Sequence, residues 1–231
     1  MVPHTPPNKI QMHLQKTLIK IFGFVLSMIT IAAYPAYSQI TIVPAGLKPG
    51  DSLRLIFVTD GTIAGNLTSI EDYNAFATSQ ANSIEDLKVI NTQWSAVVSH
   101  RDANGKYTRA VENTEPGNTE TDNTVASAGI YNFKGERVAA NTAALWLTKS
   151  TELTATVNVT QSGVEPPSNQ VWTGSEHQGK PGGKPLGQTN PSGAVARGSA
   201  GTLGSGWLNA GSTPGTALRP IYVISDVLWI P

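Results

Sequence analysis

The amino-acid sequence predicts an α+β fold, with a mixed or antiparallel sheet, two helices and a long irregular loop region. Charged residues make up 14% of the 231 residues, well below the roughly 25% of an ordinary soluble domain. Glycine occurs 22 times and proline 15 times, which argues against a helical bundle. Short apolar runs bounded by turn residues recur along the chain, as is typical of strands. The absence of cysteine excludes a disulfide framework, a thiolate metal site and a cysteine nucleophile.

The first 38 residues are interpreted as a secretory signal peptide. Lys9, Lys16 and Lys20 precede an uncharged, mostly apolar stretch at 21–33, and small residues at 36–38 mark a cleavage site. The alternative is a membrane anchor, but the apolar stretch is shorter than the about 20 residues that a spanning helix needs. We therefore expect an exported bacterial protein, secreted or held in the cell envelope, with no membrane span after leader cleavage.

The residues after the predicted signal peptide contain the first expected strands and helices. A short β-type run at 39–43 precedes the most strand-like segment of the chain, 53–59, which is apolar and β-branched. Ser69 begins a capping-box motif, and apolar residues then recur at helical spacing, which predicts a helix over about 70–81. Ser83 begins a second capping motif, which predicts a shorter helix.

The remaining apolar runs predict a single domain over 39–231, with its core at about 47–225. We expect a long polar surface loop at 100–128. No linker or internal repeat divides the chain. The expected strands lie at 94–99, 129–133, 137–138, 154–159, 170–174 and 218–225, with a turn or short helix at 143–146.

A change of composition sets residues 174–215 apart. Twelve of the 22 glycines fall in this segment, and large apolar side chains are scarce. Because burial cannot offset the entropy of ordering such a stretch, we expect a long irregular loop that is fixed at a few points. Trp207 is the best candidate for an anchor, although an indole flanked by glycines also suits stacking on a sugar.

The order of several motifs resembles a known fold family. The motifs are Gln93-Trp94-Ser95-Ala96, Ile130-Tyr131-Asn132-Phe133-Lys134-Gly135, Leu145-Trp146, Val171-Trp172-Thr173-Gly174-Ser175, Trp207 and Ile221-Tyr222-Val223-Ile224. Together they resemble the C-type lectin-like fold, in particular its endostatin-like branch. They are also similar to exported bacterial proteins of unknown function of the PEP-CTERM type. The resemblance covers about 47–225 and implies that the strand near 171–174 lies in the core and that the following loop binds ligand.

The chain departs from that family at its metal and ligand motifs. The family's disulfides and its calcium-binding triplet are missing, since Glu165-Pro166-Pro167 neither matches the triplet nor follows the core strand. The zinc site and arginine-rich heparin surface of endostatin also have no matching residues. Four carboxylates at Glu112, Glu115, Glu120 and Asp122 lack the spacing of a calcium loop. We therefore expect no metal and no cofactor.

The sequence carries no recognisable catalytic motif. His100 and His177 are the histidines of the mature chain, and neither accompanies a serine motif of the Gly-x-Ser-x-Gly type. The formal net charge is zero, which gives no basic surface for nucleic acid.

We therefore predict a non-enzymatic, secreted binding module that presents the loop at 174–215 to an extracellular glycan or protein. The candidate ligand-binding residues are Glu176, His177, Trp207 and Asn209. The alternative is a structural protein of the envelope or extracellular matrix without a small ligand, which predicts a flat, disordered loop and an exposed apolar edge.

Overall fold

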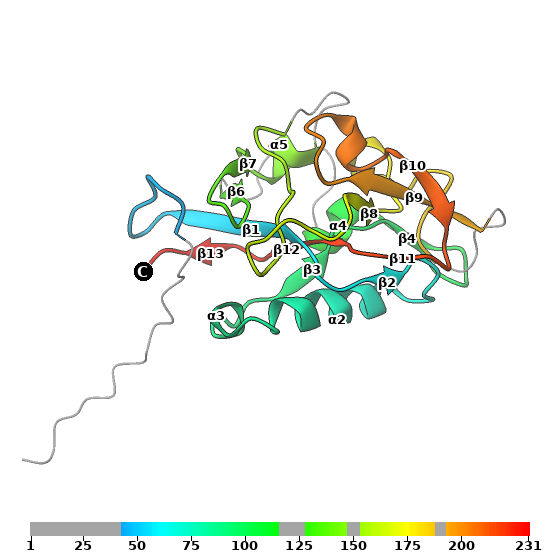
Figure 1. Ribbon diagram of the computed structural model, residues 1–231, viewed down its shortest axis with the longest axis horizontal. Helices are drawn as coiled ribbons and strands as arrows, with labels where there is room; N and C mark the ends of the chain where they lie inside the picture. The colour runs from blue at the N-terminus through cyan, green and yellow to red at the C-terminus, as the bar shows by residue number, and fades with distance from the viewer. Residues whose placement is uncertain (1–42, 116–127, 147–152, 188–192) are drawn as a thin grey trace, which may run out of the picture. The chain divides into compact units, whose positions relative to one another are not determined.

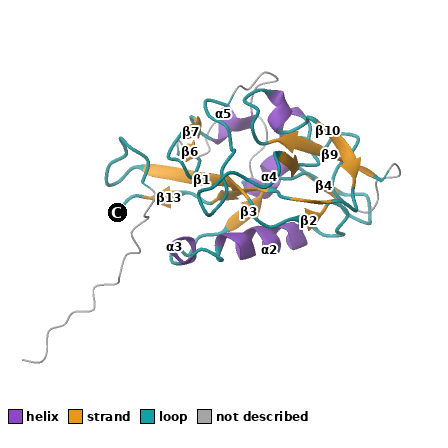
Figure 2. Cartoon of the chain, in the orientation of Figure 1, coloured by secondary structure: helices purple, strands orange, loops and turns teal. Residues whose placement is uncertain are grey.

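The computed structural model describes residues 43–115, 128–146, 153–187 and 193–231 (Figure 1). The predicted signal peptide and nearly all of the strand predicted at 39–43 lie outside these ranges. The described residues belong to one compact unit. Short helices and strands are mixed within it, so the predicted α+β class is confirmed (Figure 2). Among the described residues, no helix has the length and apolar character that crossing a membrane requires.

The main sheet is built around β1 (Ser52–Val58), the apolar run predicted as the first strand. Its strands follow the order β3-β12-β1-β6-β7, and β13 also pairs with β1. β1 runs antiparallel to β12 and β13 but parallel to β6. The two ends of the domain therefore meet in one sheet. The other strands are β3 (Trp94–Ala96), β6 (Gly129–Tyr131), β7 (Arg137–Ala139), β12 (Tyr222–Ser225) and β13 (Leu228–Trp229).

Alternate residues of β1 enter two separate hydrophobic cores because successive side chains of a strand point to opposite faces. Leu53, Leu55 and Phe57 belong to one core, and Ile56 and Val58 belong to the other. Helix α2 packs against the first core. Short helices and two buried tryptophans fill the second. The sheet is thus covered on both faces.

Helix α2 (Ile70–Ala81) has the predicted bounds. Ser69 is its N-cap and accepts a hydrogen bond from the Glu71 amide at 3.1 Å. Helix α3 (Glu85–Lys88) is a single turn, and the cap predicted at Ser83 is wrong. The Ser83 hydroxyl instead donates to the Gln80 carbonyl at 2.6 Å, so it serves the end of α2.

The polar loop predicted from residue 100 onward is wrong for the part that the structure describes. It contains β4 (His100–Arg101), β5 (Tyr107–Thr108) and α4 (Ala110–Thr114). Asp102 accepts hydrogen bonds from two amides of its own turn, which closes the β4–β5 hairpin. Ala110 and Val111 are buried, so two small apolar residues are enough to dock a short helix. The remainder of the predicted loop, 116–127, lies outside the described residues.

The glycine-rich segment also differs from its prediction. Two parts of it, β9 and β10, pair with each other, and β9 also pairs with β8, which precedes the segment, in a second sheet of order β10-β9-β8. Most of its other described residues lie in turns and irregular structure, as predicted, and 188–192 lie outside the described residues. Gly198 shows why glycine is needed: a Cβ there would lie 1.8 Å from the Trp207 carbonyl oxygen. The elements are β8 (Gln170–Trp172), η1 (His177–Gly179), β9 (Ala194–Ser199), η2 (Ser205–Trp207) and β10 (Gly211–Pro214).

The second sheet is joined to the body of the domain at Trp172, which is fully buried. Its amide donates to the Pro220 carbonyl at 2.9 Å, and its indole N–H donates to the Ile63 carbonyl at 3.0 Å. Both acceptors lie beside a two-stranded sheet of β2 (Ile63–Ala64) and β11 (Leu218–Arg219). The prediction that Trp172 is a core residue is confirmed.

The short elements predicted between 129 and 146 form, whereas the strand predicted at 154–159 does not. The predicted hairpin forms between β6 and β7, and α5 (Thr142–Trp146) is the expected short helix. The strand predicted at 154–159 does not form. Val157 and Val159 are buried as the alternation suggested, but the segment contacts the sheet through single hydrogen bonds, such as the Val58 amide to the Val159 carbonyl at 2.9 Å.

Candidate functional site

A polar hollow of about 240 Å³ lies on the second sheet, beside β9 and β10. All its lining residues come from the glycine-rich segment, and they approach one another because β9 and β10 pair in the register Ser212↔Ala196. We call it the glycine-walled hollow. It is lined by Glu176, Gly182, Gly183, Lys184, Ala196, Asn209, Gly211 and Ser212.

Glycine leaves room for the Glu176 carboxylate where the chain passes it at Gly182. A Cβ at Gly182 would lie 2.3 Å from Glu176 Oε1, so a larger residue would displace the carboxylate. The Glu176 amide donates to the Lys180 carbonyl at 2.8 Å, which closes the turn around η1. The glycines therefore shape the hollow and leave its polar groups exposed.

A direct side-chain contact fixes the opposite wall. The Lys184 ammonium donates to Ser212 Oγ at 2.8 Å. The Lys184 carbonyl accepts from the Ala196 amide at 2.8 Å, so the lysine segment is tied to β9. Glu176 and Lys184 bring opposite charges to the same hollow, and neither takes part in an ion pair with another described residue. The hollow thus offers hydrogen-bond donors and acceptors without a strong net charge.

Two of the four predicted ligand-binding residues line this hollow. Glu176 and Asn209 are both exposed there, although 33 positions separate them in the chain. His177 is exposed and follows Glu176 directly, but it is not among the lining residues. Sequence reasoning missed Lys184 and Ser212, because no local motif marks them. Their approach depends on the pairing of β9 with β10.

Trp207 does not reach the hollow, since its side chain is only 1% exposed. Its ring packs against Trp146 and Tyr222, with centroid distances of 5.9 and 5.5 Å. The Tyr222 hydroxyl also donates to the Trp207 carbonyl at 3.1 Å. Trp207 therefore anchors the glycine-rich segment to the main sheet, as predicted, and the alternative that it stacks on a ligand is wrong.

A buried cluster of serine hydroxyls lies next to Glu176 in the chain. Ser99 Oγ lies 2.9 Å from Ser175 Oγ, accepts from the Ala110 amide at 3.0 Å and donates to the Gly179 carbonyl at 3.0 Å. A Cβ at Gly179 would meet the Trp146 ring at 2.7 Å, so the chain also packs tightly here. These contacts hold the backbone on both sides of Glu176 against the body of the domain.

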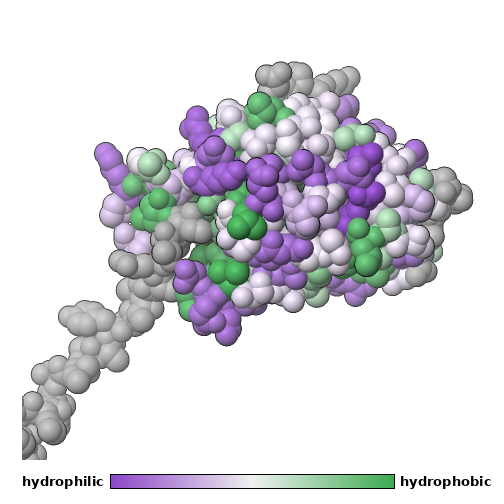
Figure 3. All heavy atoms as spheres, viewed as in Figure 1, coloured by the Kyte–Doolittle hydropathy of each residue, from purple (hydrophilic) through white to green (hydrophobic). Residues whose placement is uncertain are grey.

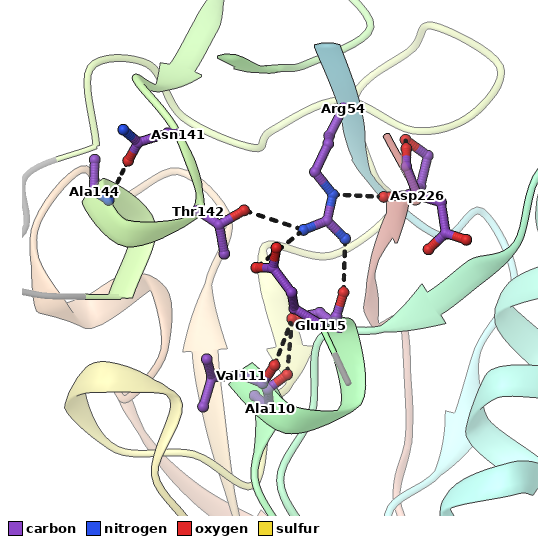
Figure 4. Close-up of polar contacts among 10 residues, drawn as sticks. Arg54, Ala110, Val111, Glu115, Asn141, Thr142, Ala144 and Asp226 are labelled. Carbon is purple, nitrogen blue, oxygen red and sulfur yellow. Dashed lines mark hydrogen bonds and ion pairs between the residues drawn. The ribbon is translucent and has the colours of Figure 1, made fainter. Parts of the chain in front are cut away.

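Among the described residues, Arg54 on β1 is the one buried Arg, Lys, Asp or Glu, and it does not line the hollow. Figure 4 shows its polar contacts. Arg54 Nε donates to the Ser225 carbonyl at 2.7 Å, and Nη2 donates to the Thr114 carbonyl at 2.7 Å. Nη1 donates to Thr142 Oγ1 at 3.2 Å and lies 3.7 Å from Glu115 Oε2. Burial lowers the pKa of Arg54, while the negative charges of Glu115 and Asp226 raise it. Because each nitrogen has a protein partner, Arg54 is a structural group that joins β1, β12, α4 and α5.

Two buried tyrosines are also structural. Burial raises the pKa of Tyr73 and of Tyr222 well above the ordinary value of 10.0. The Tyr73 hydroxyl donates to the Ala64 carbonyl at 3.0 Å, so both phenols are neutral donors within the core. The described residues also contain no group of three or more His, Cys, Asp or Glu side chains placed to hold a metal ion.

No protein-family model and no curated protein matches the chain. A function must therefore be inferred from the geometry of the chain itself. That geometry identifies the glycine-walled hollow as the place where predicted site residues converge on accessible space.

Proposed function

We propose that this protein is a secreted, non-enzymatic binding module with a C-type lectin-like fold, and that its glycine-walled hollow binds a glycan. The observation that carries the proposal is the convergence of Glu176, Lys184, Asn209 and Ser212 around one hollow. The fold proposal is supported by the sheet that both chain ends close, by two consecutive helices after β1, and by the buried Trp172.

The chemistry of the hollow favours a small hydroxyl-bearing group. A carboxylate, an ammonium, an amide and a hydroxyl together can donate to and accept from sugar hydroxyls. The volume of about 240 Å³ is below the roughly 300–1,000 Å³ of pockets that enclose drug-sized ligands. We therefore expect it to hold one sugar unit of a glycan, with the rest of the chain in solvent.

The second candidate function is a structural role in the envelope without a small ligand. Leu218, 67% exposed on the short strand β11, is the observation that favours it, because assembly needs an exposed apolar edge. On the face drawn in Figure 3, however, hydrophobic residues form small separate patches among hydrophilic ones. The ordered strands β9 and β10 also differ from the flat, disordered loop that this function predicts.

A glycan array separates the two functions. Residues 39–231 would be tested with and without calcium, beside Glu176→Gln and Asn209→Ala. Glu165→Gln is the matched control, because Glu165 is exposed but does not line the hollow. We expect a glycan class whose binding falls by about tenfold or more, or about 1.4 kcal/mol, in both hollow variants and is unchanged in the control. A blank array would favour the structural role.

A further inference from the structure

We propose that a second hollow, beside the C-terminal strand β13, binds one pyranose unit of a neutral saccharide. It has a volume of about 420 Å³, within the roughly 300–1,000 Å³ typical of ligand pockets. Asp51, Tyr131, Arg137 and Trp229 are among its lining residues, and it shares no residue with the glycine-walled hollow. We call it the Trp229 hollow. The proposal does not depend on the function proposed above.

Trp229 is exposed on a backbone that strand pairing holds in place. Its side chain is 67% exposed, whereas the other four tryptophans are at most 2% exposed. β13 pairs with β1 in the register Ser52↔Trp229, and the next residue, Ile230, donates its amide to the Asp51 carbonyl at 2.9 Å (Figure 1). Leu228 and Ile230 are buried on either side. The strand therefore holds the indole toward solvent, where it adds little to the stability of the core.

Two charged side chains, Asp51 and Arg137, line the same hollow. Asp51 Oδ2 accepts from the Lys48 amide at 2.8 Å, which orients the carboxylate and leaves its other oxygen available. The guanidinium of Arg137 is exposed, and it has no hydrogen bond or ion pair with the residues that the structure describes. The hollow thus combines an oriented acceptor with a planar group of donors.

The ring of Tyr131, which also lines the hollow, lies close over Gly129. A Cβ at Gly129 would lie 2.8 Å from a carbon of that ring and 3.2 Å from its hydroxyl oxygen. Glycine therefore allows the ring to lie against the backbone of β6, where it contributes to the lining. A second aromatic surface is available in this way beside the exposed indole.

A neutral pyranose matches this combination of groups. One face of the sugar ring presents C–H groups, which pack on an aromatic surface, and its rim presents hydroxyls that both donate and accept. Asp51 would accept from hydroxyls, and Arg137 would donate to them. The opposite charges of these two residues disfavour a strongly anionic or cationic ligand. We therefore infer a neutral saccharide rather than a phosphate-bearing or acidic one.

The tryptophan emission of the purified protein tests the proposal, because Trp229 is the most exposed of the five tryptophans. The probes are neutral hexasaccharides of β-1,4-linked glucose, β-1,4-linked N-acetylglucosamine and α-1,4-linked glucose. We expect at least one to shift the emission to the blue and to reduce quenching by acrylamide. Trp229→Ala should abolish the response, and Asp51→Asn and Arg137→Gln should each weaken binding by about tenfold or more.

Glu176→Gln separates this site from the glycine-walled hollow and should leave the response unchanged. Near-ultraviolet circular dichroism checks that each variant is folded, and the exposed Arg137 and Trp229 are the safest positions to change. The proposal would be overturned if no saccharide probe altered the emission or if the response survived in Trp229→Ala. It would also be overturned if peptides, and none of the saccharides, altered the emission. Loss of the response in Glu176→Gln would also contradict it, because the binding would then belong to the other hollow.

Discussion

Replacing Arg54 with methionine tests the buried network on β1. The change removes three hydrogen bonds and the positive charge that faces Glu115, whose side chain is 13% exposed. The carbonyls of Thr114 and Ser225 also lose their guanidinium donor inside the core. Removing one partner of a buried ion pair costs about 3–5 kcal/mol of unfolding free energy. For a domain of this size, that loss lowers Tm by about 6–20 °C.

Urea unfolding, followed by tryptophan emission, measures the loss. Lys88→Met is the matched control, because it breaks the exposed pair of Lys88 with Glu85 and should cost less than about 1 kcal/mol. Arg54→Met combined with Glu115→Gln should recover part of the loss, because a neutral amide then replaces the carboxylate that has lost its guanidinium partner. A loss in Arg54→Met no larger than that in Lys88→Met would refute the structural role assigned to this arginine.

Three further predictions concern the core and the helix start. Gly198→Ala should lower the unfolding free energy by about 3 kcal/mol or more, because the new Cβ would meet the backbone at Trp207. The control Gly204→Ala, whose Cβ would have nothing within 4 Å, should change it by less than about 1 kcal/mol. Equal urea midpoints for the two variants would contradict this prediction. Burial raises the pKa of Tyr222, so its stabilising effect is complete below the ordinary value of 10.0 and is lost as the pH rises above it. The unfolding free energy of Tyr222→Phe should therefore fall less than that of the unmodified protein between about pH 8 and about pH 11. An equal fall in both proteins would contradict the assignment of this loss to the buried Tyr222 hydroxyl. Ser69→Ala removes the N-cap of α2 and should lower the unfolding free energy, measured in urea, by about 1 kcal/mol. This loss should exceed that of Ser83→Ala. A larger loss in Ser83→Ala would contradict the cap assignment.

The elements that sequence reasoning located are those with strong local patterns. Helix α2 combines a serine cap with buried residues at helical spacing, and both features lie within one segment of 13 residues. β1 is an uninterrupted apolar run, so its position in the centre of the sheet follows from its composition. Trp172 is a large apolar side chain that follows Val171 in a β-type run, and its burial was also predictable. In each case the information lies within a short stretch of chain.

The elements that were missed depend on distant parts of the chain. β9 and β10 contain few large apolar residues, and backbone pairing with each other and with β8 orders them. The importance of Gly198 appears only when Trp207 is placed beside it. Helix α4 has five residues, too few for a periodic pattern to be read. Pairing of this kind leaves almost no trace in local composition.

The candidate site was predictable only in part, because strand pairing determines which of its residues lie together. Glu176 and Asn209 were identified as polar residues of the glycine-rich segment, and they line one hollow. Trp207 was assigned to the same site because its glycine neighbours suggested exposure, but its ring packs within the core. Lys184 and Ser212 join the site through the register of β9 and β10. Sequence reasoning therefore located the segment that carries the site, but the sheet determines which of its residues meet.

The central claim is that β9 and β10 of the glycine-rich segment form an ordered pair of strands that shapes the hollow. Amide hydrogen exchange followed by mass spectrometry tests this claim most directly, because the amide of Ala196 on β9 donates to the Lys184 carbonyl at 2.8 Å. We predict that peptides covering β9 and β10 exchange as slowly as peptides covering β1. Exchange of the β9 and β10 peptides within seconds, with β1 still protected, would contradict the account.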